Sequence, residues 1–318
     1  MQNDKTNDNW IRIDPKNIPL AVIHTENYEK KKPEIEKINQ ALIVAHQNND
    51  LREGGMLFLS LGEIFFSLLI FVKALEYYEQ ALIIFRLLED RREEAHTLSL
   101  LGDVYLPLKQ LALAIGHHEK SLNIYRELGD RHAEAKELTT LGTDCLFFGQ
   151  EARALEYNKQ ALVISREIGD RHRQAKALYG IGVVYLKTGQ EKYVLEYLKQ
   201  ALNIYREIGE RIEEAQTLFN IGTYYFLLHS QEDRGIESFE QALVIYREIG
   251  DSANEAMTLK GLGGIYFNLR QLDKAIEITQ MSVDIYNEIG DAAGADRAQE
   301  QLDILRKEAS RKWWQIWK

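Results

Sequence analysis

The side chains best suited to chemistry in this chain are eight histidines and a single cysteine. Two histidines can hold a metal ion when they lie one helical turn apart, as in the pattern His-Glu-x-x-His. That spacing does not occur, and His132 and His172 are one sequence position repeated in two successive units. The pair within "GHHEK" at Gly116–Lys120 is predicted to lie on the solvated face of a helix. The sequence therefore predicts no metal site and no cofactor.

The cysteine and one pair of adjacent glycines are equally poor candidates for catalysis. Cys145 stands at a position that is a packed tyrosine elsewhere in the chain, so it is expected to be a buried thiol rather than a nucleophile. The stretch "LGGIYFNLR" at Leu262–Arg270 matches neither a phosphate-binding loop nor a dinucleotide-binding turn. We therefore predict that the protein is not an enzyme.

The composition argues against several other classes of protein. The 318 residues are 45% hydrophobic and 28% charged, which is typical of a folded globular chain. The 39 basic and 49 acidic side chains give a net charge of −10, so nucleic acid is not expected as a partner. The first residues lack the pattern of a secretory signal, and the apolar window Ile64–Val72 is far shorter than the roughly 20 residues of a membrane-spanning helix. A cytoplasmic location is predicted.

The elements that carry these residues are sequence repeats. A glycine that follows leucine or isoleucine recurs with a spacing of 40 residues four times and then 41, at Gly62, Gly102, Gly142, Gly182, Gly222 and Gly263. Each unit contains two segments with apolar residues at three- and four-residue steps, which predicts a pair of helices, A and B. The extra residue is expected in the turn near "LLHSQEDRG".

The short phrase "IGD" separates one helix pair from the next. Its glycine suits the left-handed turn that ends a helix, and its aspartate can accept amide hydrogen bonds at the start of the following helix. This starting position is occupied by Asp90, Asp130, Asp170, Asp251 and Asp291, with Glu210 as a weaker substitute.

The pattern resembles that of the tetratricopeptide repeat family, in which helix A carries large apolar, Leu-Gly and Tyr positions and helix B carries small residues. Examples here are Leu178, Gly182 and Tyr185 in one helix A and Ala154 and Ala161 in one helix B. The unit length is similar to that of the kinesin-light-chain and LGN-like subclass, and such near-identical units are similar to cyanobacterial arrays. The resemblance implies an all-α, right-handed superhelix of about six helix pairs with capping helices at both ends.

The repeats divide the chain into three parts. Residues 1–33, which contain three prolines, are predicted to form an extended arm. The repeat array is predicted over residues 34–290, as a half repeat 34–49 followed by repeats 50–89, 90–129, 130–169, 170–209, 210–250 and 251–290. Residues 291–318 are predicted to form a capping helix that ends in a basic tail rich in tryptophan.

In this family one face of helix A lines a concave groove that binds partner peptides, and the resemblance implies the same face here. The residues four after the repeat glycine are all large and apolar: Phe66, Leu106, Leu146, Leu186, Phe226 and Phe267. Tyr179 and Phe219 add aromatic rings, and Asn220 occupies a position at which the LGN-like subclass holds a partner's backbone. Because that subclass has further asparagines that this chain lacks, the pattern favours recognition of an apolar helix. The alternative is that these side chains pack against neighbouring helices.

Two more surfaces could take part in association. One is an apolar corner in the first turn between helices, Leu69, Ile70 and Phe71; the other is the tail with Trp313, Trp314 and Trp317. The tail is predicted to fold back over the last repeat, with docking on another protein or contact with a membrane surface as alternatives.

The sequence thus favours a non-catalytic adaptor, monomeric or weakly homo-oligomeric, whose groove binds a peptide or amphipathic helix of a partner protein. The alternative is a self-associating structural scaffold. It would use the apolar corner and the tryptophan tail, and its own termini would occupy the groove.

Overall fold

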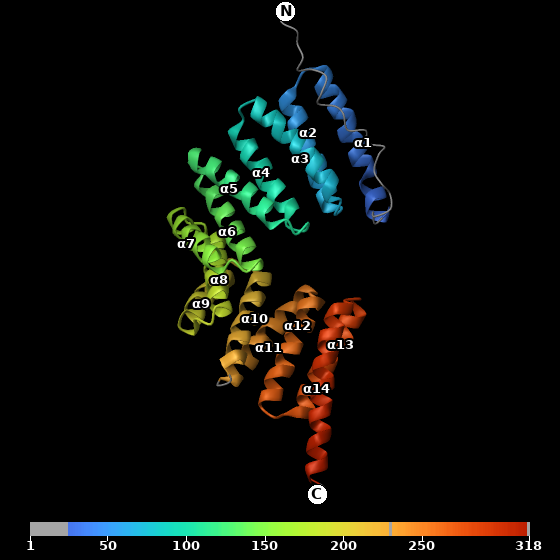
Figure 1. The fold of residues 1–318 in the computed structure, drawn as a ribbon, viewed down its shortest axis with the longest axis vertical. Helices are drawn as coiled ribbons and strands as arrows, with labels where there is room; N and C mark the ends of the chain where they lie inside the picture. Colours follow the sequence, from blue (N-terminus) through green and yellow to red (C-terminus); the bar gives the residue numbers. More distant parts are fainter. Residues whose placement is uncertain (1–24, 229–230, 317–318) are drawn as a thin grey trace, which may run out of the picture. The chain divides into compact units, whose positions relative to one another are not determined.

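The computed structural model describes residues 25–228 and 231–316, with side chains from residue 27 to residue 310 apart from 229 and 230. All regular secondary structure in these residues is α-helical (Figure 1). The helices are α1 Thr25–Gln47, α2 Leu51–Ser67, α3 Phe71–Leu87, α4 Arg91–Tyr105, α5 Leu111–Glu127, α6 Arg131–Phe147, α7 Glu151–Glu167, α8 Arg171–Lys187, α9 Glu191–Ile208, α10 Arg211–Leu228, α11 Glu232–Ile249, α12 Ser252–Asn268, α13 Leu272–Glu288 and α14 Ala292–Ile316.

The chain divides into two compact units, Met1–Gln150 and Glu151–Lys318. In each unit every helix packs against the next one along the chain, from α1 to α6 in the first and from α7 to α14 in the second. The all-α, pairwise-stacked fold predicted from the repeats is therefore confirmed. The boundary between the units falls inside the repeat predicted at 130–169, between its helices A and B.

The turns between repeats follow the predicted chemistry. At the end of α5, Gly129 has φ +66° and the amide of Asp130 donates to the carbonyl of Tyr125. The carboxylate of Asp130 then accepts a hydrogen bond of 3.1 Å from the amide of Ala133, which caps the start of α6. The same side-chain cap is present at Asp50, Asp90, Asp170, Asp251 and Asp291.

Packing within a helix pair depends on the glycine of helix A. A Cβ atom placed on Gly182 would lie 2.6 Å from Leu198, and one on Gly222 would lie 2.6 Å from Phe239, so no larger residue fits without rearrangement. Phe239 follows its glycine by one residue more than Leu198 does, because the extra residue of this repeat precedes it. The extra residue of the 41-residue unit therefore lies between Gly222 and Phe239, and helix B still packs on the repeat glycine.

The first helix differs from the sequence prediction. The segment 1–33 was expected to be extended, but α1 begins at Thr25 and contains Pro33. Proline removes one backbone donor from a helix, and here Tyr28 packs against the hydrophobic core of the first unit. An ion pair between Lys31 and Glu34 lies beside the proline. Tertiary packing thus outweighs the proline, and the part of the predicted arm before residue 25 lies outside the described residues.

At the other end, α14 packs against α13 of the last repeat. Ala298 and Leu302 are fully buried and join the core cluster that contains Val283 and Tyr286 of α13. Gln301, one of its polar positions, donates a hydrogen bond of 3.2 Å to the backbone carbonyl of Lys260 in α12. In the part of the chain that the structure describes, no helix is apolar enough over a sufficient length to cross a membrane.

Candidate functional site

The predicted groove residues of the second unit lie on α8, α10 and α12. Phe219, Phe226 and Phe267 are partly buried and pack against the core cluster around Phe239. The rings of Phe219 and Phe239 have centroids 5.5 Å apart. Each of these side chains therefore places part of its surface in the core and leaves part accessible. The sequence allowed either packing against neighbouring helices or exposure in a groove, and these rings do both in part.

A hydrogen bond links two of the predicted groove residues across neighbouring A helices. The amide nitrogen of Asn220 lies 2.9 Å from the hydroxyl oxygen of Tyr179, and it also donates to the backbone carbonyl of Gln216 at 3.1 Å. Burial raises the pKa of the Tyr179 phenol, so the hydroxyl stays protonated at neutral pH. Both amide protons of Asn220 are used within the chain, which leaves its carbonyl oxygen as the group able to contact a ligand.

The ring of Phe226 on α10 lies close to a glycine of α12. A Cβ atom on Gly264 would lie 3.0 Å from the ring of Phe226, so the glycine gives this ring room to lie against α12. Leu186 is partly buried on α8. We call Tyr179, Leu186, Phe219, Asn220, Phe226 and Phe267 the aromatic stripe.

The first unit carries the remaining predicted groove residues. Phe66, Leu106 and Leu146 are each partly buried, on α2, just after α4 and on α6. The ring of Phe66 lies 5.8 Å from that of Phe71, in a tilted arrangement, and both join the core cluster of this unit. This part of the predicted groove is more aliphatic than the aromatic stripe.

The apolar corner predicted in the first unit is only partly exposed. Leu69 is 67% exposed and has φ +61°, a conformation that leucine adopts at a cost. Ile70 and Phe71 pack against the core cluster. The side chains of Trp313, Trp314 and Trp317 lie outside the described residues.

Sequence reasoning missed a buried polar cluster in the first unit. "GHHEK" was expected on a solvated face, but His118 has no exposed surface, because it packs over Gly102 as Leu198 does over Gly182. Nδ1 of His118 lies 3.1 Å from the carboxylate of Glu137, whose other oxygen accepts a 2.7 Å hydrogen bond from Ser99. The recurrence of this glycine-facing position in every repeat was the signal that could have revealed the burial.

Carboxylates control the titration of this cluster. Burial acts to lower the pKa of His118, but its hydrogen bond to the Glu137 carboxylate and the charges of Glu137, Asp103 and Asp144 outweigh burial and raise that pKa. Burial raises the pKa of Asp103. No group of three or more His, Cys, Asp or Glu side chains among the described residues is arranged to hold a metal ion. Cys145 is fully buried, as expected.

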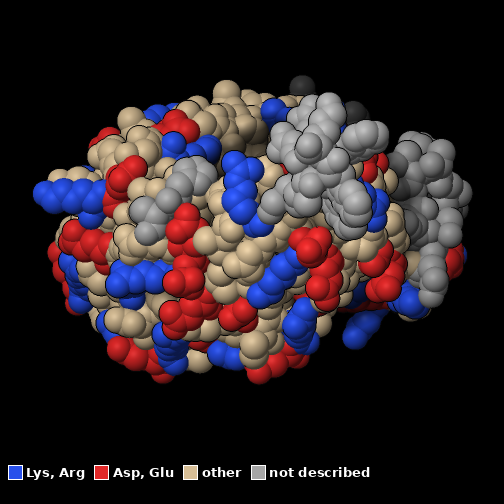
Figure 2. All heavy atoms as spheres, turned by 90° about the horizontal axis from the view of Figure 1, so that it is seen from below, with Lys and Arg blue, Asp and Glu red and all other residues tan. Residues whose placement is uncertain are grey.

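Arginine and glutamate form a repeating ladder on the outer ends of the helices. The guanidinium of Arg206 lies 2.9 Å from Glu214, which also pairs with Arg211 at 2.7 Å. Arg211 in turn reaches Glu248 of the following helix B at 2.6 Å. The pairing of an arginine with the glutamate eight residues later recurs at Arg126, Arg206 and Arg247. Acidic and basic side chains are interspersed over the face seen in Figure 2.

Comparisons with known proteins agree with this architecture. A sequence profile described as tetratricopeptide repeat matches residues 56–127, 93–167, 138–207 and 213–288. Among solved structures, the chain is similar to BtubC (BKLC) from P. vanneervenii, with 19% identity, a TM-score of 0.59 and coverage of 69% of this chain and 89% of that one.

Two further similar structures contain a bound factor or peptide according to their descriptions. One is a Rap protein complexed with Competence and Sporulation Factor, at 18% identity, TM-score 0.56 and coverage of 82% and 76%. The other is the Rap conjugation gene regulator of the plasmid pLS20 in complex with the Phr* peptide, at 16% identity, TM-score 0.54 and coverage of 84% and 77%. At these identities the likeness shows the fold alone. No curated protein sequence matches the chain.

Proposed function

The chain belongs to the tetratricopeptide repeat family, and from this premise we propose that it is a non-catalytic adaptor whose aromatic stripe binds an apolar helix face of a partner protein. The single observation that carries the proposal is the row of partly buried rings on α10 and α12, which are seated in the core and still accessible. An aromatic side chain that core contacts already hold in place loses little conformational entropy on binding, so it can contribute strongly to affinity.

The hydrogen bonding of Asn220 favours a helix over an extended peptide as the partner. An asparagine that clamps a peptide backbone needs a donor and an acceptor on the same amide. Here Tyr179 and the carbonyl of Gln216 take both donors, so Asn220 offers one acceptor. An amphipathic helix has no need of such a clamp, because its backbone groups are satisfied internally.

The comparison structures support a peptide or protein partner. Two proteins of this fold were solved with a factor or a peptide bound, and the 40-residue unit favours the kinesin-light-chain and LGN-like subclass. We extend the proposal to a cytoplasmic protein that does not bind nucleic acid. The interspersed charges of Figure 2 and the net charge of −10 support this.

Selection from a displayed library of amphipathic helical peptides tests the proposal. Thr223 lies on the same face of α10 as Phe219 and Phe226 and is partly exposed. Thr223→Arg should weaken the selected peptides by at least ~10-fold, because the long cation blocks the stripe without removing a core side chain. Val163→Arg on α7, where valine is 56% exposed, is the matched control and should bind normally. Equal binding to the Thr223 variant contradicts the groove assignment.

Self-association is a second candidate because α3 exposes an apolar surface in the first unit. Val72, Ile83 and Leu87 of α3, and Leu69 in the turn before it, are each at least 60% exposed. Side chains of this kind gathered on one element mark an association site more often than chance exposure does. Sedimentation velocity should show a species larger than a monomer that Val72→Asp dissociates. A monomer at all concentrations removes this candidate.

A further inference from the structure

One repeat of the second unit has a small polar side chain at a position where four other repeats carry a ring. In helix B, the residue directly before the one that faces the repeat glycine is Tyr77, His117, Tyr157, Tyr197 or Ile278, and in the fifth full repeat it is Ser238. Tyr77 stacks on Phe65 with centroids 5.3 Å apart. His117 stacks on Tyr105 at 5.3 Å, and Tyr197 lies 5.6 Å from Tyr185. Tyr225 is the equivalent helix A residue, and the small side chain of Ser238 cannot cover it in this way.

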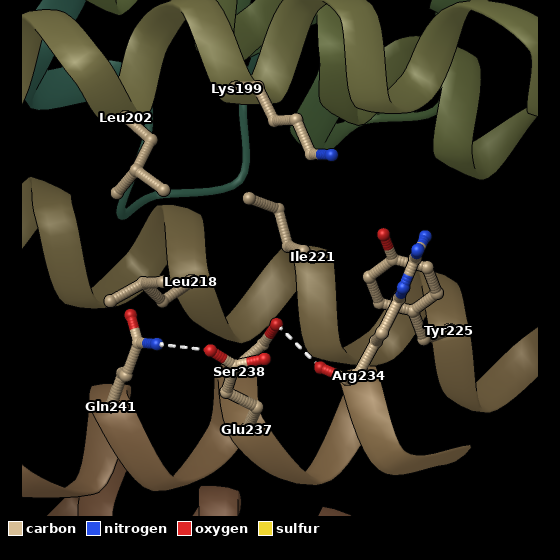
Figure 3. A pocket seen from close by; sticks show the side chains of 9 residues that line it. All are labelled: Lys199, Leu202, Leu218, Ile221, Tyr225, Arg234, Glu237, Ser238 and Gln241. Atoms are coloured by element: carbon tan, nitrogen blue, oxygen red, sulfur yellow. Dashed lines mark hydrogen bonds between the residues drawn. The ribbon is translucent and has the colours of Figure 1, made fainter. Parts of the chain in front are cut away.

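A cavity of roughly 280 Å³ occupies the place of the missing ring (Figure 3). Its floor is apolar and comes from α9 and α10: Leu202, Leu218, Ile221 and the ring of Tyr225. Ser238 lies at its edge, and its hydroxyl donates to the backbone carbonyl of Arg234 at 2.8 Å. The volume is large enough for one aromatic side chain. The cavity therefore has the size and the apolar floor that binding of an aromatic ring requires.

The rim of the cavity is polar and carries two cations and one carboxylate. Arg234 on α11 lies with its guanidinium 6.0 Å from the centroid of the Tyr225 ring and donates to Gln231 at 2.8 Å. Lys199 on α9 is exposed and forms no ion pair with any residue in the described ranges. The carboxylate of Glu237 accepts a hydrogen bond of 3.2 Å from Gln241. The excess positive charge favours an anionic group next to the ring.

We infer that this cavity is a second binding site, which takes an aromatic side chain of a partner polypeptide flanked by carboxylates. The ring stacks on Tyr225 and fills the space that Tyr197 fills one repeat earlier, and the carboxylates face Lys199 and Arg234. Leu218, Ile221 and Tyr225 lie on a different face of α10 from Phe219 and Phe226, since each residue turns the helix by about 100°. The site therefore does not depend on the aromatic stripe.

Methyl NMR of the full chain tests this inference directly, because Leu202, Leu218 and Ile221 supply reporter methyl groups on the cavity floor. The probe is an acetylated and amidated pentapeptide, Gly-Asp-Tyr-Glu-Gly. It should shift the Ile221 methyl signal in a saturable way. The peptides Gly-Asp-Ala-Glu-Gly and Gly-Lys-Tyr-Lys-Gly should bind at least ~10-fold more weakly, because one lacks the ring and the other the negative charge.

Ser238→Tyr is the decisive variant, because it restores the ring that other repeats carry at this position. It should weaken binding of Gly-Asp-Tyr-Glu-Gly by at least ~10-fold, while the thermal unfolding midpoint of the protein stays equal or rises. Ser238→Ala is the matched control and should bind as the wild type does, and Thr223→Arg should leave this site unchanged. Absence of a saturable shift at millimolar peptide, or equal shifts in Ser238→Tyr, overturns the inference. Binding of N-acetyltyrosine as tight as that of the peptide also overturns it, since the occupant would then be a small aromatic anion.

Discussion

Nδ1 of His118 lies 3.1 Å from the carboxylate of Glu137, and neither side chain has more than a trace of exposed surface. The two residues come from successive helices, α5 and α6, so the contact ties one repeat to the next. Ser99 on α4 donates to the remaining oxygen of the same carboxylate. Three consecutive helices of the first unit thus share one buried polar contact.

Removal of one partner of this pair should be costly. Glu137→Ala leaves Nδ1 of the buried His118 and the hydroxyl of Ser99 without their hydrogen-bond partner, and we expect the free energy of unfolding of the first unit to fall by about 1 to 3 kcal/mol. The double variant His118→Leu/Glu137→Ala, which removes both partners of the contact, should recover at least half of this loss. Urea unfolding of the three proteins measures the difference. If the double variant is no more stable than Glu137→Ala, the unpaired imidazole is not the cause of the loss.

The neighbouring histidine should make the protein sensitive to acid. Burial, followed by the charge of Lys120, lowers the pKa of His117 to about 4. The pKa of a histidine in an unfolded chain is about 6.5, so below this pH the unfolded protein binds a proton that folded His117 does not. Stability is therefore highest above pH 6.5 and is lost as the pH falls toward 4. His117→Tyr introduces the tyrosine that other repeats carry at this position, as Tyr77 and Tyr197. Its thermal unfolding midpoint, relative to that of the wild type, should therefore rise as the pH falls from 6.5 to 4. The raised pKa of His118 acts in the opposite direction and is present in both proteins.

A reciprocal exchange separates this titration from a simple gain in ring packing. Tyr197→His places a histidine on Tyr185 in the second unit, as His117 lies on Tyr105. This variant should lose stability as the pH falls over the same interval. Parallel curves of unfolding midpoint against pH for wild type and both variants would contradict the assignment.

Several turns of the first unit carry residues in an unfavourable backbone conformation. Glu89 has φ +54° and Lys109 has φ +59°, whereas glycine occupies the equivalent positions 129 and 149 of the next repeat. Glu89→Gly and Lys109→Gly should each stabilise the protein by about 0.5 to 1 kcal/mol, because the left-handed conformation costs more for a side-chain-bearing residue than the extra flexibility of glycine does. Gly129→Ala is the opposite change and should destabilise. Urea unfolding of the single variants checks both signs.

The regular part of this fold could be predicted from the sequence because its signals are local and repeated. The aspartate that caps most A helices, such as Asp130, and the glycine that usually precedes it act within a few residues, so spacing alone located them. The start of α1 was not predicted, because the packing of Tyr28 on a distant core decides it. The burial of His118 depends on Glu137 in the next helix, a partner that no periodicity indicates.

The candidate sites show the same division. The positions of the aromatic stripe follow from the helical period, and all of its members lie partly buried on A helices. The hydrogen bond between Asn220 and Tyr179 joins residues from two repeats and could not be inferred from either one. The cavity beside Ser238 is visible in the sequence as a missing ring, but its depth depends on three helices.

The Arg–Glu ladder has a gap at Gln174, and completing it should stabilise the second unit. In three other repeats a glutamate at this position, Glu94, Glu134 or Glu214, pairs with the arginine eight residues earlier and with the arginine three residues earlier. At the gap, Arg171 donates to Gln174 at 3.0 Å and Arg166 stands eight residues earlier. Gln174→Glu should raise the free energy of unfolding by about 0.5 to 1 kcal/mol at low salt, because it replaces a neutral acceptor with a charge that two guanidinium groups bracket.

Salt and pH distinguish this electrostatic gain from a change in packing. The gain should shrink in 1 M salt, where the screening length is about 3 Å. Glu94 shows the sign expected for pH: burial acts to raise its pKa, but the hydrogen bonds from Arg86 and Arg91 outweigh burial and lower it. A carboxylate with a lowered folded pKa contributes stability above its unfolded pKa of about 4.3 and loses it as the pH falls through the folded value. The advantage of Gln174→Glu should therefore vanish in acid, and a gain that is unchanged by salt and acid would exclude the ladder as its source.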